Sequence, residues 1–129
     1  MPSTERGEDV ALSAFAAPIV EGKQAQWREF IREIGDGGSR HEAYVASRQA
    51  MGVRERSFLQ PTPMGDLAIV TLEGDDPGSA MAKIAGANDE FTQWFVAQVL
   101  EIHGFDLRQI ATQPIPEMAI DSGPVLANA

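Results

Sequence analysis

The chain has 129 residues and a mass of 13.9 kDa, enough for one domain with a buried core. Its formal net charge of −9 repels phosphate backbones and anionic membranes, and no basic stripe offsets that charge, so we expect no binding to nucleic acid or to membranes. The absence of cysteine excludes disulfides, thiolate nucleophiles and thiolate metal sites.

The N-terminal sequence MPSTERGEDV is polar and acidic, and it lacks the basic start and apolar run of a secretory signal. The longest apolar run, AFAAPIV, is too short to span a bilayer. We therefore expect a soluble, cytoplasmic protein. Its domains are predicted as a disordered leader at residues 1–9, a single folded domain at 10–121 and a C-terminal tail at 122–129.

Three segments have the composition of β-strands. Residues 10–19 are small and apolar, and they run up to Pro18, which cannot donate a hydrogen bond to a sheet. Residues 53–63 alternate between two faces, and residues 67–74 form a β-branched, apolar run. The turn sequence between them, PTPMGD, predicts that these two strands form a hairpin.

The segment 22–52 has helical periodicity. The glycines of GDGG at 35–38 predict a break in the middle of it, because glycine readily adopts the left-handed conformation that ends a helix. Ser39 and Glu42 have the spacing of a capping box, which predicts that the second half begins at Ser39. The apolar stripe of the first half consists of Trp27, Phe30, Ile31 and Ile34.

The second half of the chain predicts two more helices and a strand. Residues 75–86 begin with acidic residues and a proline, as helices often do. A helix capped by Asn88 or Asp89 follows and ends at Gly104, and its buried stripe includes Phe91, Trp94, Phe95 and Ile102. A short apolar run at 117–121 predicts the last strand.

The resulting order predicts an α+β fold. It is a ferredoxin-like βαββαβ sandwich with split helices and a four-stranded antiparallel sheet, whose helices cover one face. The other face is predicted to carry Arg54, Arg56, Phe58 and Gln60, a mixture typical of neither solvent nor core. The sheet of a second copy packed against this face would account for the mixture, so we expect a homodimer.

The chain resembles the dimeric α/β-barrel superfamily, in which two ferredoxin-like protomers pack sheet to sheet. The resemblance covers roughly residues 10–121 and is carried by three stretches: GKQAQWREFIREI, RERSFLQPTPMGDLAIVTLEGDD and NDEFTQWFVAQVLEIHGFDL. It is strongest for a bacterial branch without an assigned activity. The resemblance implies a dimeric α/β barrel. Other branches include cofactor-free monooxygenases, lactone isomerases and heme-handling enzymes, but none of their catalytic motifs matches residues of this chain.

His103 and Tyr44 are the candidate catalytic residues. His103 lies in the last turn of a predicted helix, where a histidine can bond free carbonyls and interact with the helix dipole. A catalytic His103 requires instead a cleft and a neighbour such as Asp106 or Tyr44 within hydrogen-bond reach. His41 is expected to be solvent-exposed, and no metal site or cofactor is predicted.

Arg54, Arg56, Phe58 and Trp94 are the candidate ligand-binding residues. Two arginines at i and i+2 project to the same face of a strand, where they are either solvated or paired with an anion. Glu73 or Asp66 across the hairpin, a partner's carboxylate or an acidic ligand would serve. Trp94 is also consistent with a place in the core.

Three functional hypotheses follow. The first is a homodimer that binds a small apolar or weakly acidic molecule between sheet and helices. The second is a cofactor-independent monooxygenase or isomerase, with His103, Tyr44 and Arg54 or Arg56 around the pocket. The third is a structural dimer with a filled interior. The volume of the interior distinguishes them, because ligand sites usually occupy several hundred Å³.

Overall fold

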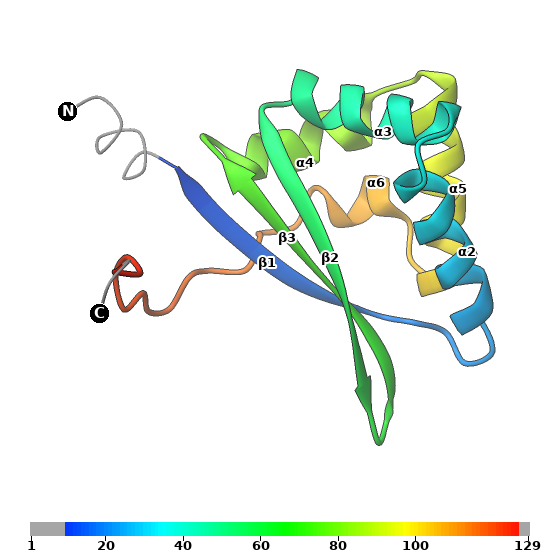
Figure 1. Cartoon of the computed structure of the whole chain (residues 1–129), viewed down its shortest axis with the longest axis horizontal. Coiled ribbons are helices and arrows are strands. Elements are labelled where there is room, and N and C mark those ends of the chain that lie inside the picture. The colour runs from blue at the N-terminus through cyan, green and yellow to red at the C-terminus, as the bar shows by residue number, and fades with distance from the viewer. Residues whose placement is uncertain (1–9, 127–129) are drawn as a thin grey trace.

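The computed structural model of the chain describes residues 10–126 (Figure 1). The predicted leader at 1–9 and the last three residues of the predicted tail lie outside this part. Residues 10–126 form a mixed α+β fold whose elements are β1 (Ala11–Pro18), α2 (Gln24–Gly35), α3 (Ser39–Ala50), β2 (Val53–Thr62), β3 (Gly65–Gly74), α4 (Pro77–Gly86), α5 (Glu90–His103) and α6 (Leu107–Ile110).

The strands form one antiparallel sheet in the order β1-β3-β2. The predicted hairpin is confirmed, with β2 and β3 joined at Met64. Across the sheet, Phe15 of β1 lies opposite Val70 of β3, which lies opposite Ser57 of β2. This arrangement is compatible with a ferredoxin-like fold.

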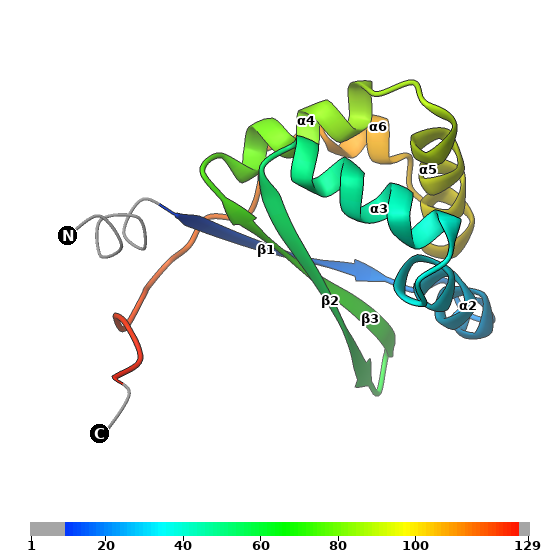
Figure 2. The same cartoon turned by 45° about the horizontal axis from the view of Figure 1, so that its top comes forward.

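The helices lie on one face of the sheet and leave the other face open, as Figure 2 shows. Alternation along the strands decides which side chains face the helices. Ala17, Ala68 and Leu72 face the helical layer and are buried. Arg54 and Phe58 point to the open face and are exposed, as the alternation of residues 53–63 predicts.

The helical region between β1 and β2 is split into α2 and α3, as the glycines predict. The predicted capping box is wrong, because the N-cap of α3 is Gly38 and no side chain caps the helix. Gly37 has φ +81°, which turns the chain before Ser39 is reached. The Gly38 carbonyl then accepts the first helical hydrogen bond, from the Glu42 amide at 3.0 Å.

The helices after β3 begin and end where the sequence indicates. The carboxylates of Asp76 and Asp89 cap α4 and α5, accepting hydrogen bonds from the amides of Ser79 and Thr92. The Thr92 hydroxyl also donates to Asp89, and these hydrogen bonds lower the pKa of the carboxyl group. Left-handed Gly104 ends α5. The four residues of α6 were not predicted, since they are too few to show a period.

The predicted strand at 117–121 is not formed within the described residues. Pro114 and Pro116 precede the segment, and proline has no N–H to donate to a sheet. The chain from 114 to 126 has no regular secondary structure and is exposed, and it runs past β1 without pairing with it. The sheet therefore has three strands, and β1 lies at its edge.

A compact turn connects α3 to β2 at Gly52, which has φ +72°. The turn packs against the last residue of β3, Gly74, so closely that a Cβ there would lie 2.2 Å from the Gly52 carbonyl oxygen. A larger residue at position 74 would push the turn away. Glycine at 74 thus fixes the position of α3 relative to the sheet.

The core lies between the sheet and the helical layer, and Ile102 of α5 is its most buried side chain, at 0% exposure. Replacing Ile102 by alanine should lower the free energy of unfolding by about 2–5 kcal/mol, because the lost packing leaves a cavity. Urea denaturation monitored by circular dichroism measures the change. The matched control is Leu100→Ala in the same helix: Leu100 is 51% exposed, so a change within about 0.5 kcal/mol is expected. Equal losses in both variants would contradict this assignment of the core.

Candidate functional site

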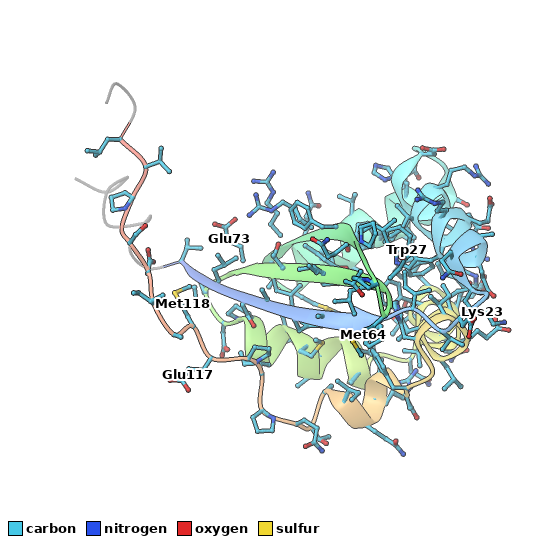
Figure 3. The ribbon with its side chains drawn as sticks, turned by 90° about the horizontal axis from the view of Figure 1, so that it is seen from below. Lys23, Trp27, Met64, Glu73, Glu117 and Met118 are labelled. Atoms are coloured by element: carbon cyan, nitrogen blue, oxygen red, sulfur yellow. The ribbon has the colours of Figure 1, made fainter. Side chains whose placement is uncertain are left out.

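A cavity of about 60 Å³ lies between the sheet and the helical layer and is partly open to solvent. All three strands and helices α2 to α6 contribute to its walls. Trp27, labelled in Figure 3, lines it from α2. Besides that indole, the lining side chains are apolar except for four, Arg48, Glu55, Ser57 and His103.

The Arg48 and Glu55 side chains form a buried ion pair, at 5% and 8% exposure. Arg48 Nε donates to Glu55 Oε1 at 2.7 Å, and Arg48 Nη1 donates to the Ser47 hydroxyl at 2.9 Å. The guanidinium also lies 4.9 Å and 4.7 Å from the ring centroids of Tyr44 and Phe95. Hydrogen bonds and ring faces therefore surround a charge that would be expensive to bury alone.

This pair links the last turn of α3 to the third residue of β2. Seven residues separate the partners, and the turn at Gly52 brings them together across the interior. Because the two charges neutralise each other, we assign this ion pair a structural role: it holds α3 against the sheet.

Tyr44 lies beside this pair and packs against Phe91, with ring centroids 6.4 Å apart. Burial raises the pKa of Tyr44 above its usual range, and the negative charge of Glu55 raises it further, although Arg48 opposes the shift. Its phenol therefore stays protonated across the physiological range. Tyr44 is not among the residues that line the cavity.

His103 lies at another part of the cavity wall, where α5 meets the end of β1. Its Nδ1 is 2.9 Å from the Pro18 carbonyl oxygen. Because a carbonyl only accepts, Nδ1 carries the hydrogen, and Nε2 of the neutral ring is a free acceptor. The ring stacks on Phe105, with centroids 5.7 Å apart. The His103 ring thus links α5 to the end of β1. It does not bond to the carbonyl groups at the end of its own helix.

Neither of the expected neighbours of His103 hydrogen-bonds to it. The Asp106 carboxylate accepts from the Arg108 amide at the start of α6. Burial lowers the pKa of His103, and the bond to Pro18 opposes the shift only in part. The ring is therefore neutral near pH 7, with Nε2 able to accept a proton.

His103 and the ion pair lie far apart along the cavity. Glu55 of β2 and Ser13 of β1 both pair with Leu72 of β3, so they lie at the same level of the sheet. His103 instead bonds to Pro18, at the end of β1. Ser13 and Pro18 are five residues apart on one strand, a distance of roughly 16 Å. A small molecule could contact one polar group or the other, but not both.

Three of the predicted ligand-binding residues, Arg54, Arg56 and Phe58, lie on the open face of β2 and not in this cavity. Arg56 Nη2 pairs with Glu73 across the hairpin at 3.1 Å, one of the partners anticipated for it. Figure 3 shows Glu73 near the end of β3. Phe58 is 54% exposed, and Leu12 of β1 is 43% exposed on the same face of the sheet.

Trp94, the fourth predicted ligand-binding residue, belongs to the helical layer. Its ring lies 5.6 Å from Phe30 and 5.9 Å from Phe91, and the Arg40 guanidinium stacks 3.8 Å above it. It does not line the cavity.

The sequence contains one signal for the buried pair. On β2, Glu55 shares its face with Val53 and Leu59, so alternation alone places a carboxylate among apolar side chains. Such a residue needs a cationic partner, but nothing in the sequence identifies Arg48 as that partner. Ser57, on the same face, was missed because it matched no catalytic motif.

No family model matches the chain, and neither a curated protein nor a solved structure matches it. Among residues 10–126, no three His, Asp or Glu side chains gather closely enough to hold a metal ion. In the same part of the chain, no helix has the length and apolarity that crossing a bilayer requires.

The buried pair can be tested by comparing single and double variants. Glu55→Leu leaves the Arg48 charge buried without a partner, so the free energy of unfolding should fall by about 3–5 kcal/mol. Arg48→Met/Glu55→Leu removes both charges and should be clearly more stable than the single variant. Urea denaturation gives the values, and the exposed pair is the control: Glu73→Leu should change stability by about 1 kcal/mol or less. A double variant as unstable as Glu55→Leu would contradict mutual neutralisation.

His103 should contribute a pH-dependent term to stability. Its pKa is lowered from 6.5 in the folded chain, so acid protonates the unfolded chain first. The contribution is therefore complete above about pH 6.5 and is lost as pH falls through the lower, folded value. His103→Asn removes the titrating ring. The stability difference between wild type and His103→Asn, measured by urea denaturation from pH 5 to 7.5, should rise with pH, and a flat difference would contradict the shift.

Proposed function

We propose that this chain is a homodimeric binding protein for a small, largely apolar molecule with one weakly acidic group. The observation that carries the proposal is the partly open apolar cavity, with His103 among its lining residues and the Nδ1 of that ring held by the Pro18 carbonyl. Apolar walls with a few placed polar groups are typical of small-molecule sites. The cytoplasmic location and independence of cofactors stay predictions.

The volume limits the size of the ligand. The cavity of 60 Å³ is small, whereas most ligand sites occupy roughly 300–1,000 Å³. A ligand must therefore be small, or side chains must move as it enters. Met81 is the best candidate for such movement, because its unbranched side chain adapts to irregular spaces.

The polar group of the ligand should contact His103 or Ser57 rather than the ion pair. Arg48 and Glu55 already satisfy each other and are nearly inaccessible. Ser57 lines the cavity and is exposed, so a ligand could reach it from solvent. A weak acid could donate its hydrogen to His103 Nε2, which is neutral at pH 7.

The same histidine favours a second candidate function, that of a cofactor-independent monooxygenase or isomerase. Such chemistry begins with removal of a proton from the substrate, and a neutral imidazole beside an apolar cavity is a suitable base. Tyr44 gains no support as a base, because it stays protonated and lies off the cavity.

A nitrophenol, whose colour changes when it ionises, tests directly whether His103 acts as a base. His103 as base should increase the ionised fraction of the bound nitrophenol at neutral pH, and His103→Asn should abolish the increase. The same ionised fraction in both proteins would contradict the catalytic role of His103 without affecting the binding proposal.

The open face of the sheet supports the homodimer. It carries Leu12 and Phe58, which are exposed and apolar, beside the Arg56–Glu73 pair, whose charges are already matched within one protomer. Two such faces can stack with their apolar residues covered, and Arg54, which lies on the same face, would then need a carboxylate of the partner. Packing of two sheets in this way would produce the barrel of the proposed dimeric fold.

Phenol is a suitable probe for the ligand site, with benzene as its counterpart that lacks the hydroxyl group. Phenol should bind with a Kd of about 1 mM or tighter in isothermal titration calorimetry. His103→Asn should weaken phenol binding and leave benzene binding unchanged.

Ala17→Leu fills the cavity and should abolish both interactions, whereas Ala16→Leu, on the opposite face of the same strand, should preserve them. No binding of either probe by the wild type would contradict the binding function and favour the structural dimer with a filled interior.

A further inference from the structure

Apart from Pro18 at its last position, the free edge of β1 lacks the features that normally protect the edge of a sheet. Exposed edges usually carry charged residues or proline, because unpaired N–H and C=O groups invite another strand. The other edge, β2, has Arg54, Glu55, Arg56 and Pro61. From Ala11 to Ala17, β1 has only small or apolar residues and one serine. The β1 edge is therefore suited to accept a further strand.

The chain after Pro116 has the pattern of such a strand. In residues 117–121, Met118 and Ile120 alternate with Glu117, Ala119 and Asp121. Ile120 is 88% exposed, whereas isoleucine side chains in folded proteins are usually buried. The segment ends at a turn in which the Asp121 carboxylate accepts from the Gly123 amide.

The path of the tail keeps the segment from pairing with its own β1. Ile115 lies beside Gly78 in the first turn of α4, 3.6 Å from where a Cβ on Gly78 would be. That turn follows Gly74, which lies opposite Ala11, so the tail arrives at the N-terminal end of β1. An antiparallel neighbour would have to arrive at the Pro18 end. From Met118 the tail continues away from the sheet (Figures 1 and 3).

We propose that residues 117–121 of one copy pair with the free edge of β1 in a second copy, and that the exchange is reciprocal. Each sheet then gains a fourth strand from its partner. The proposal rests on the proposed homodimer and identifies the segment that completes its interface.

The area of the sheet favours the exchange. The strands have eight, ten and ten residues, so the face measures roughly 440 Å² and two such faces together cover roughly 900 Å². Specific interfaces usually bury about 1,200–2,000 Å², and the paired tails would add to the area.

Cross-linking between isotopically distinct copies tests the exchange in the full-length chain. The protein has no cysteine, so Ala14→Cys/Ala119→Cys places two unique thiols, at the middle of β1 and at the middle of the segment. A bis-maleimide with a spacer of about 8 Å reaches both opposite and diagonal positions on neighbouring strands. Unlabelled and ¹⁵N-labelled chains are mixed, unfolded, refolded together and cross-linked, and the joined peptides are identified by mass spectrometry.

Exchange predicts that about half of the links between β1 and the segment join a labelled to an unlabelled chain, because symmetric dimers assemble at random from an equal mixture. Links within single chains only would overturn the proposal and leave the homodimer standing. Absence of links in a protein that native mass spectrometry shows to be dimeric would do the same. A monomer would overturn both. The control is Ala97→Cys/Ala119→Cys, whose first thiol lies on the exposed face of α5 and should give no such link.

A point substitution gives an independent measurement. Ile120→Glu should raise the dissociation constant of the dimer about tenfold or more, because a charge replaces an apolar side chain at the interface. Ile120→Val should leave it nearly unchanged. Equal dissociation constants for Ile120→Glu and wild type would contradict burial of this side chain by the partner.

Discussion

A sheet of three strands with helices on one face is the constraint on which the rest of this molecule depends. The helices bury one set of alternating side chains and leave the other set in solvent, including Leu12 and Phe58. A sheet with one solvated face is common, but that face is then usually polar. Here it combines these apolar side chains with the Arg56–Glu73 pair and Arg54, and we propose that a second copy covers it. The unprotected edge of β1 and the exposed tail have the same explanation in this account, because the proposed second copy would cover both.

On the covered face, the main electrostatic feature is the buried Arg48–Glu55 pair. It anchors α3, whose position is also set by the close approach of Gly52 to Gly74. Replacing such pairs by apolar residues is often neutral or stabilising, so its presence alone is weak evidence for stability. Here the Arg48–Glu55 pair forms one end of the cavity wall, and His103 forms another part of it. Between them the walls are apolar, which defines the kind of ligand that we propose.

The sequence predicted the local structure well because its signals are local. Alternation located β2 and its two faces, glycines located the break between α2 and α3, and Asp89 and Gly104 marked the ends of α5. The strand at 117–121 could not be predicted reliably, because strand formation depends on a neighbour that a single chain does not supply. The site was harder still. His103 was singled out, but its bond to Pro18 joins residues 85 positions apart, and no local pattern encodes that contact or the pairing of Arg48 with Glu55.

The central claim is that a second copy covers the open face of the sheet. Sedimentation-velocity ultracentrifugation of the full-length chain over a range of micromolar concentrations tests it most directly. The account predicts a species of twice the 13.9 kDa chain mass that persists to low micromolar concentration. A species of 13.9 kDa at every concentration would contradict it.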